Sequence, residues 1–148
     1  MDTYDASECN QTTEPPVWTV AVADDEPEIL DYLVRVLTFL GCHVVARAAD
    51  GRELVEQCRL MRPELVVTDV RMPSMSGLQA IAELAREQPI LAIFISAQKP
   101  GALDPPVPHN CIVDFLVKPV RRTDIAVALE RAAQKRNEAA IARPTAVA

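Results

Sequence analysis

The sequence lacks the patterns by which several common classes of protein are recognised. Its 148 residues include four cysteines but no Cys-x-x-Cys pair, and His43 and His109 do not have the spacing of a zinc site. No apolar run approaches the roughly 20 residues needed to cross a bilayer. The N-terminus is acidic, where a secretory signal would be basic. We therefore expect a cytoplasmic protein with reduced thiols and no membrane span.

Basic charge is also scarce. The chain has 15 basic and 21 acidic side chains, which give a net charge of -6. Four of the acids lie in the first sixteen residues, so the remainder is closer to neutral and has no basic face of the kind that binds nucleic acid. The glycine-rich phosphate-binding patterns GxGxxG and GxxxxGK[ST] are absent as well. We expect no direct DNA binding.

The composition, with 49% hydrophobic and 24% charged residues, is that of one globular domain. Residues 1–16 are polar and acidic and end in two prolines, which predicts a disordered leader. Residues 17–137 alternate between strand-like and helix-like patterns and form the predicted domain. Residues 138–148 are predicted to be a flexible C-terminal tail.

Within the domain, five short apolar runs predict strands at 18–23, 42–47, 65–68, 90–95 and 111–117. Helical spacing predicts helices that begin after residue 26, after Asp50, near residue 77 and at Thr123, which is expected to cap the last one. Four prolines between residues 100 and 108 disfavour a regular fourth helix, which is expected to be short, irregular or absent. The pattern indicates an α/β fold, a doubly wound five-stranded parallel sheet covered on both faces.

In doubly wound folds, ligands bind at the carboxyl ends of the strands. Asp24 and Asp25 follow the first predicted strand, and Asp69, Ser96 and Lys118 follow the third, fourth and fifth. Three solvent-accessible carboxylates suit Mg²⁺, and a lysine would offset the remaining negative charge. Such a site can hold a phosphoryl group on a carboxylate, because cationic groups neutralise its oxygens. Asp69 would then be the nucleophile.

These residues resemble the response-regulator receiver family. The resemblance rests on Asp24-Asp25, on Asp69 followed by Met72-Pro73 and Gly77, on Ser96, and on Phe115 three residues before Lys118-Pro119. It covers residues 17–137. It implies a flavodoxin-like (βα)5 receiver, of the stand-alone chemotaxis type, that acts as a phosphorylation-dependent switch in a two-component or phosphorelay system.

The resemblance also implies how the phosphoryl group is bound. Asp69 would accept it from a sensor histidine kinase or a phosphotransfer protein, and the chain would catalyse only its own phosphoryl transfer and autodephosphorylation. Mg²⁺ would be held by Asp25, by Asp69 and by the backbone carbonyl of Arg71, with Asp24 reaching the ion through water. Lys118 would pair with the phosphoryl oxygens.

Two further residues would carry the switch. Ser96 would move to hydrogen-bond the phosphoryl group while Phe115 changes rotamer, and an unknown downstream protein would read the altered surface. In the family the Lys118-Pro119 bond is often cis. Arg71 and Gln98 occupy the two positions that tune phosphoryl lifetime, and an arginine there can contact the phosphoryl group or obstruct the hydrolytic water.

Other interpretations stay open at this point. Asp24, Asp25 and Glu26 also suit a helix N-terminus stabilised by acids, and Phe115 also suits a core position. The prolines at 100–108 are compatible with a phosphorylation-independent interaction module whose site is vestigial. A third alternative is a Mg²⁺-dependent phosphatase. Such an enzyme is expected to have a second aspartate, its general acid, two residues after the nucleophile, and this chain has Arg71 there. A fragment of a transcription regulator is a further alternative if the gene continues beyond Ala148.

Overall fold

The structure, a computed structural model, describes residues 18–98 and 106–142. The predicted leader, Cys9, two of the four prolines of the fourth crossover (Pro100 and Pro105) and the last six residues lie outside this range. Within it, the elements alternate as predicted, with five strands, four α-helices and one 3-10 turn. Among the described residues, no helix combines the length and apolarity needed to span a membrane.

The five strands form one parallel sheet with the order β2-β1-β3-β4-β5. Their bounds are β1 (Thr19–Ala23), β2 (His43–Ala48), β3 (Leu65–Asp69), β4 (Leu91–Ser96) and β5 (Ile112–Val117). β1, β3 and β4 occupy the centre and are almost entirely buried, as expected of strands covered on both faces. The predicted doubly wound fold is confirmed.

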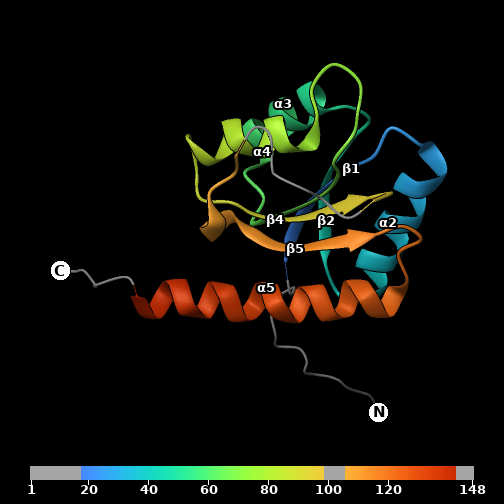
Figure 1. Ribbon diagram of the computed structural model, residues 1–148. Helices are drawn as coiled ribbons and strands as arrows, with labels where there is room; N and C mark the ends of the chain where they lie inside the picture. Colours follow the sequence, from blue (N-terminus) through green and yellow to red (C-terminus); the bar gives the residue numbers. More distant parts are fainter. Residues whose placement is uncertain (1–17, 99–105, 143–148) are drawn as a thin grey trace, which may run out of the picture.

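The helices cover the sheet in two layers, α3 and α4 on one face and α2 and α5 on the other (Figure 1). Their bounds are α2 (Pro27–Phe39), α3 (Gly51–Met61), α4 (Gly77–Ala85) and α5 (Arg122–Ala142). Local sequence explains where they begin. Pro27 is in the first turn of α2, the Asp50 carboxylate accepts from the Glu53 N–H at 2.8 Å at the start of α3, and Ser76 and Gln79 form a capping box at α4.

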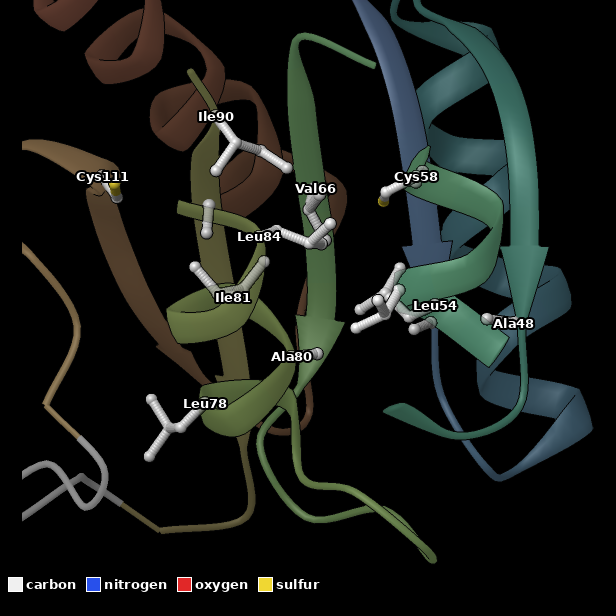
Figure 2. Packing of buried hydrophobic residues seen from close by; sticks show 14 of the residues in the cluster. Ala48, Leu54, Cys58, Val66, Leu78, Ala80, Ile81, Leu84, Ile90 and Cys111 are labelled. Atoms are coloured by element: carbon white, nitrogen blue, oxygen red, sulfur yellow. The ribbon is translucent and has the colours of Figure 1, made fainter. Parts of the chain in front are cut away.

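Each face of the sheet has its own hydrophobic core. On one face, Leu54 and Cys58 of α3 and Ile81 and Leu84 of α4 pack over Val66 of β3 (Figure 2). On the other face, apolar residues of α2 and α5 pack against β1, β3 and β4. The predicted core positions of Cys42 and Cys58 are confirmed, because both thiols are free and buried. The two cores fix the strand ends in space, and with them the residues predicted to form the site.

The last helix differs from its prediction at both ends. It begins at Arg122, so the capping position is Arg121 and not Thr123 as predicted, and the Asp124 carboxylate accepts from the backbone N–H of Arg121 at 2.9 Å. A carboxylate at the third helical position therefore binds the backbone where Thr123 was expected to do so. The helix continues to Ala142, past the predicted boundary at residue 137. Residues 138–142 are alanine-rich and contain neither glycine nor proline, so nothing in them terminates a helix.

The connection between β4 and β5 is irregular where the structure describes it. Residues 97–98 and 106–108 are not helical, and the short turn η1 (His109–Cys111) is 3-10. Val107 and Cys111 are buried and contribute to the core beneath α3 and α4. This irregular segment therefore contributes to the core through these two residues.

Candidate functional site

The strand register brings the predicted residues to one edge of the sheet. Ala23 pairs with Thr68, so the next residues, Asp24 and Asp69, are neighbours. Ser96 pairs with Val117, and the N–H of Lys118 donates to the Ser96 carbonyl at 2.9 Å. Four strand ends therefore present their polar side chains together, as the sequence predicts.

Three carboxylates form a cluster there. Oxygen atoms of Asp24, Asp25 and Asp69 all lie within 4.8 Å of one another. Asp24 is 0% exposed and Asp69 is 6% exposed, whereas Asp25 faces solvent. Two acids are thus held away from water while the third remains in contact with it.

Asp24 contacts the chain at the start of α2 and also belongs to the carboxylate cluster. Its Oδ1 accepts a hydrogen bond from the Glu26 N–H at 2.9 Å, next to the start of α2. Its Oδ2 is buried, has no hydrogen-bond partner, and lies 3.3 Å from Lys118 Nζ. One oxygen therefore helps to fix the local chain, and the other is left directed toward the cluster.

Lys118 lies between two of the acids. Its Nζ donates a hydrogen bond to Asp69 Oδ2 at 3.2 Å and lies at a similar distance from Asp24. Burial acts to lower the pKa of this ammonium group, but the attraction of Asp69 and Asp24 outweighs burial and raises the pKa. The lysine is therefore charged throughout the physiological pH range.

The pKa of Asp69 is raised. Burial is the main cause, and repulsion by Asp24 adds to it, while Lys118 and the Arg71 N–H, at 3.4 Å from Oδ1, act in the opposite direction. One lysine does not compensate two buried carboxylates. The site thus carries negative charge that a cation would neutralise.

The donor set fits a divalent, oxygen-preferring cation. Three carboxylates converge, one of them exposed, and the buried Oδ2 of Asp24 is in contact with Lys118 Nζ at 3.3 Å. Mg²⁺ typically takes one or two carboxylates and keeps several waters, which matches a cluster that opens to solvent on one side.

A pocket of about 250 Å³ opens above the cluster. It is lined by Asp25, Glu26, Asp69, Arg71, Ser96, Ala97, Gln98 and Lys118. The Ser96 hydroxyl oxygen is partly buried and accepts from the Gln98 N–H at 3.2 Å. Ser96, Arg71 and Gln98 therefore surround the same space as Asp69, as predicted.

Phe115 packs against the edge of the core and does not line this pocket. Its ring stacks on that of Phe94, with centroids 5.2 Å apart and planes 19° apart, beneath α3 and α4. Its side chain is only partly buried. In this structure Phe115 contributes to the packing around the core, and its switching role stays a prediction.

The loop between β3 and α4, residues 70–76, holds Arg71 beside the site. The Gly77 N–H donates to the Val70 carbonyl at 2.8 Å, which closes the loop, and a Cβ on Gly77 would lie 2.2 Å from the Asp69 carbonyl. Within the same loop, the backbone of Ser74 is in the left-handed region, with a φ of 68°. Glycine at position 77 is therefore required by the close approach of α4 to the end of β3.

Sequence reasoning missed some residues near the site. Glu26 and Ala97 line the pocket, and only their adjacency to Asp25 and Ser96 could have signalled this. Behind Lys118, an apolar cavity of about 410 Å³ is lined by Ile29, Tyr32, Leu33, Ile95, Lys118, Pro119 and Val120. The Tyr32 hydroxyl donates to the Val120 carbonyl at 2.9 Å, next to the cis Lys118-Pro119 bond. Nothing in the sequence links these distant segments.

Comparison with known proteins identifies the family. Residues 20–130 match the response regulator receiver domain family. The chain is 31% identical over 113 residues to the chemotaxis protein CheY of Thermotoga maritima, covering 76% of this chain and 94% of that protein. It is 36% identical over 132 residues to the positive alginate biosynthesis regulatory protein of Pseudomonas aeruginosa, covering 86% of this chain and 52% of the relative.

Solved structures give the same result. The signal receiver domain of NarL from Mycobacterium tuberculosis superposes with a TM-score of 0.71 at 31% identity, covering 81% of this chain and 98% of that one. The chain belongs to the response regulator receiver domain family, whose members are phosphorylation-dependent switches of two-component signalling. It spans about half the length of some curated relatives, such as the alginate regulator, and nearly all of the chemotaxis protein.

Proposed function

We propose that this chain is a phosphorylation switch in which Asp69 accepts a phosphoryl group. The observation that carries the proposal is the position of Lys118 Nζ, 3.2 Å from Asp69 Oδ2 and 3.3 Å from the buried Asp24 Oδ2. This arrangement supplies a nucleophilic carboxylate, one fixed positive charge and unsatisfied negative charge in a pocket open to solvent. Such a site suits phosphoryl transfer, because that reaction depends on positioning and charge compensation.

In the transfer, an oxygen of Asp69 forms a bond to phosphorus while the bond between phosphorus and a phosphohistidine nitrogen of the donor breaks. The bonding electron pair leaves with the imidazole. Lys118 then stabilises the negative oxygens of the new acyl phosphate, and Ser96 supplies a hydroxyl from the end of the neighbouring strand β4. Phosphorylation adds about -1.5 to -2 charges, enough to draw a hydroxyl and an ammonium inward.

We assign the cation to Asp25, Asp69 and the Arg71 backbone carbonyl, with Asp24 acting through water. When bound, Mg²⁺ would neutralise the transferred oxygens and bring the phosphoryl group close to Asp69. The carboxylate cluster and the raised pKa of Asp69, caused by burial and by Asp24, both support a site that requires a cation.

The proposed partners follow from this chemistry. A sensor histidine kinase or a phosphotransfer protein would donate the phosphoryl group in the cytoplasm, and a downstream protein would read the surface near β4, β5 and α5. We propose no reaction beyond the chain's own phosphorylation and autodephosphorylation, and no direct DNA contact. The net charge of -6 favours protein partners over nucleic acid.

The test is intact mass after incubation with acetyl phosphate and Mg²⁺. We expect the wild type to gain one phosphoryl group, and we expect neither Asp69→Ala nor the wild type with chelated metal to do so. Asp31→Ala, which changes an exposed aspartate on α2, is the matched control and should behave like the wild type. No adduct on the wild type would contradict the proposal and favour a phosphorylation-independent interaction module.

A further inference from the structure

We propose that Gly51, at the start of α3, is a positioning residue for the β3–α4 loop that carries the proposed cation ligand Arg71. A Cβ built on Gly51 would lie 2.0 Å from the carbonyl oxygen of Met75, 2.6 Å from its carbonyl carbon and 2.9 Å from its Cβ. Real side chains do not approach a backbone this closely. Only glycine lets α3 and the loop keep these positions.

The loop has little freedom to absorb a displacement at Met75. The Val70 N–H donates to the Ile95 carbonyl at 2.9 Å, and the Val70 carbonyl accepts from Gly77 at 2.8 Å. Within the loop, the Met75 N–H donates to the Pro73 carbonyl at 2.6 Å. Because both ends are held, a shift of Met75 is taken up by the residues between, which include Arg71.

The helix cannot retreat instead. Leu54, Val55 and Cys58 of α3 are buried in the core, and Arg59 forms ion pairs with Glu83 and Glu87 from the α4 side. Moving α3 outward would open a cavity in that core, which is costly. An added methyl at position 51 therefore displaces the loop.

The consequence reaches Asp69 by a short path. The Arg71 N–H is 3.4 Å from Asp69 Oδ1, and the Arg71 carbonyl is a proposed cation ligand. Residues that orient metal ligands from behind typically change metal affinity by 10–100-fold when they are altered. This inference rests on the proposed function for the identity of the cation site.

The experiment is a calorimetric Mg²⁺ titration of wild type, Gly51→Ala and Gly41→Ala. Gly41 has a φ of 94° at the turn between α2 and β2, at the opposite end of the sheet, so Gly41→Ala strains the backbone far from the site. We expect Gly51→Ala to bind Mg²⁺ roughly tenfold more weakly, with altered amide resonances for Arg71 and Gly77. We expect Gly41→Ala to lose thermal stability and to retain wild-type Mg²⁺ affinity.

Equal Mg²⁺ affinity in wild type and Gly51→Ala would overturn the inference, as would an equal loss in both variants. If Gly51→Ala does not fold, the inference is tested on the wild type alone, by its amide resonances with and without Mg²⁺. Linkage is reciprocal, so Mg²⁺ should shift the Gly51 amide resonance and leave that of Gly41 in place, and an unmoved Gly51 resonance would overturn the inference. A wild type that binds Mg²⁺ without taking up phosphate would refute the proposed function and leave the role of Gly51 standing.

Discussion

The two ends of the sheet treat polar groups in opposite ways. At the amino end, the backbone N–H and the side chain of Thr19 contact Glu64, whose own N–H donates to the Thr19 hydroxyl oxygen at 3.1 Å. Arg136 of α5 pairs with Glu64 and lies 3.8 Å from the centre of the Trp18 ring. At the carboxyl end, three carboxylates lie close together, and Lys118 pairs with two of them, Asp24 and Asp69.

This difference indicates that the amino end serves the stability of the fold and the carboxyl end serves its chemistry. Each end has a buried polar atom without a hydrogen-bond partner, Trp18 Nε1 at the amino end and Asp24 Oδ2 at the carboxyl end. The indole nitrogen is neutral, whereas the aspartate oxygen belongs to an acid beside another acid. Unbalanced charge in a pocket is typical of functional sites, and reciprocal pairing is typical of structural ones.

The largest expected effect comes from removing Lys118, the cation in direct contact with Asp24 and Asp69. Lys118→Met should slow phosphoryl uptake from acetyl phosphate by roughly a hundredfold, because one fixed charge no longer stabilises the transferred oxygens. Uptake is followed by intact mass against time. Lys135→Met, on the part of α5 near the amino end, is the control and should react like the wild type. Equal rates for wild type and Lys118→Met would show that the charge at the carboxyl end does not serve phosphoryl transfer.

The next effect is a dependence on pH that only the carboxyl end should show. The pKa of Asp69 is raised by burial and by Asp24, so the carboxyl group binds its proton more tightly than an ordinary aspartate. Mg²⁺ must displace this proton, and its association constant should fall about tenfold per pH unit below that pKa. Calorimetric titrations at several pH values measure the slope. A Mg²⁺ affinity independent of pH down to the ordinary pKa of aspartate would refute the raised value.

Folding stability should change with pH in a direction set by the same group. A raised pKa in the folded state means that the folded chain holds the proton more tightly than the unfolded chain. In the absence of metal, the contribution of Asp69 to stability is therefore lost as pH rises from the ordinary aspartate value through the raised one. Comparing Asp69→Asn with the wild type by denaturant unfolding across this range isolates that contribution, which the variant should not show.

A smaller effect is expected at the rim of the pocket. Arg71→Ala should shorten the lifetime of the phosphorylated form by up to about tenfold, the effect of losing one charge-assisted contact worth about 1.4 kcal/mol. Arg121→Ala, an exposed arginine after the cis peptide bond, serves as control. The decay of phosphorylated protein is followed after removal of the donor. An unchanged half-life would remove Arg71 from the mechanism.

The smallest effect is expected at the amino end. Glu64→Gln weakens the ion pair with Arg136 and should cost less than about 1 kcal/mol of stability, because the pair is exposed. Phosphoryl uptake should not change. Denaturant unfolding and the mass assay measure the two quantities on one preparation. A variant of normal stability but impaired uptake would show that the amino end takes part in the function.

Much of this molecule is predictable from its sequence because the signals are local. The apolar run at 65–68 marks β3, and Asp69 directly after it has to lie at the carboxyl edge of a parallel sheet. Register then makes neighbours of Asp24 and Asp69 without further information. The fold and the composition of the site follow from these two steps.

The features that were missed depend on contacts between distant segments. The approach of Gly51 to Met75 and the hydrogen bond from Tyr32 to Val120 join residues that share no pattern. The start of α5 lies two residues before the predicted one because Thr123 and Asp124 are both capable of capping, and the carboxylate is the one used. Alanine-rich residues after 137 continue the helix, where a tail was expected.

The central claim is that the carboxyl end is a phosphoryl-driven switch and the amino end is a passive support. Amide spectra of the wild type with Mg²⁺, recorded before and after addition of beryllofluoride as a phosphoryl analogue, test it most directly. We predict shifts at Asp69, Ser96, Phe115 and Lys118, with the resonances of Thr19 and Glu64 unmoved. No shift at the carboxyl end, or equal shifts at both ends, would contradict the account.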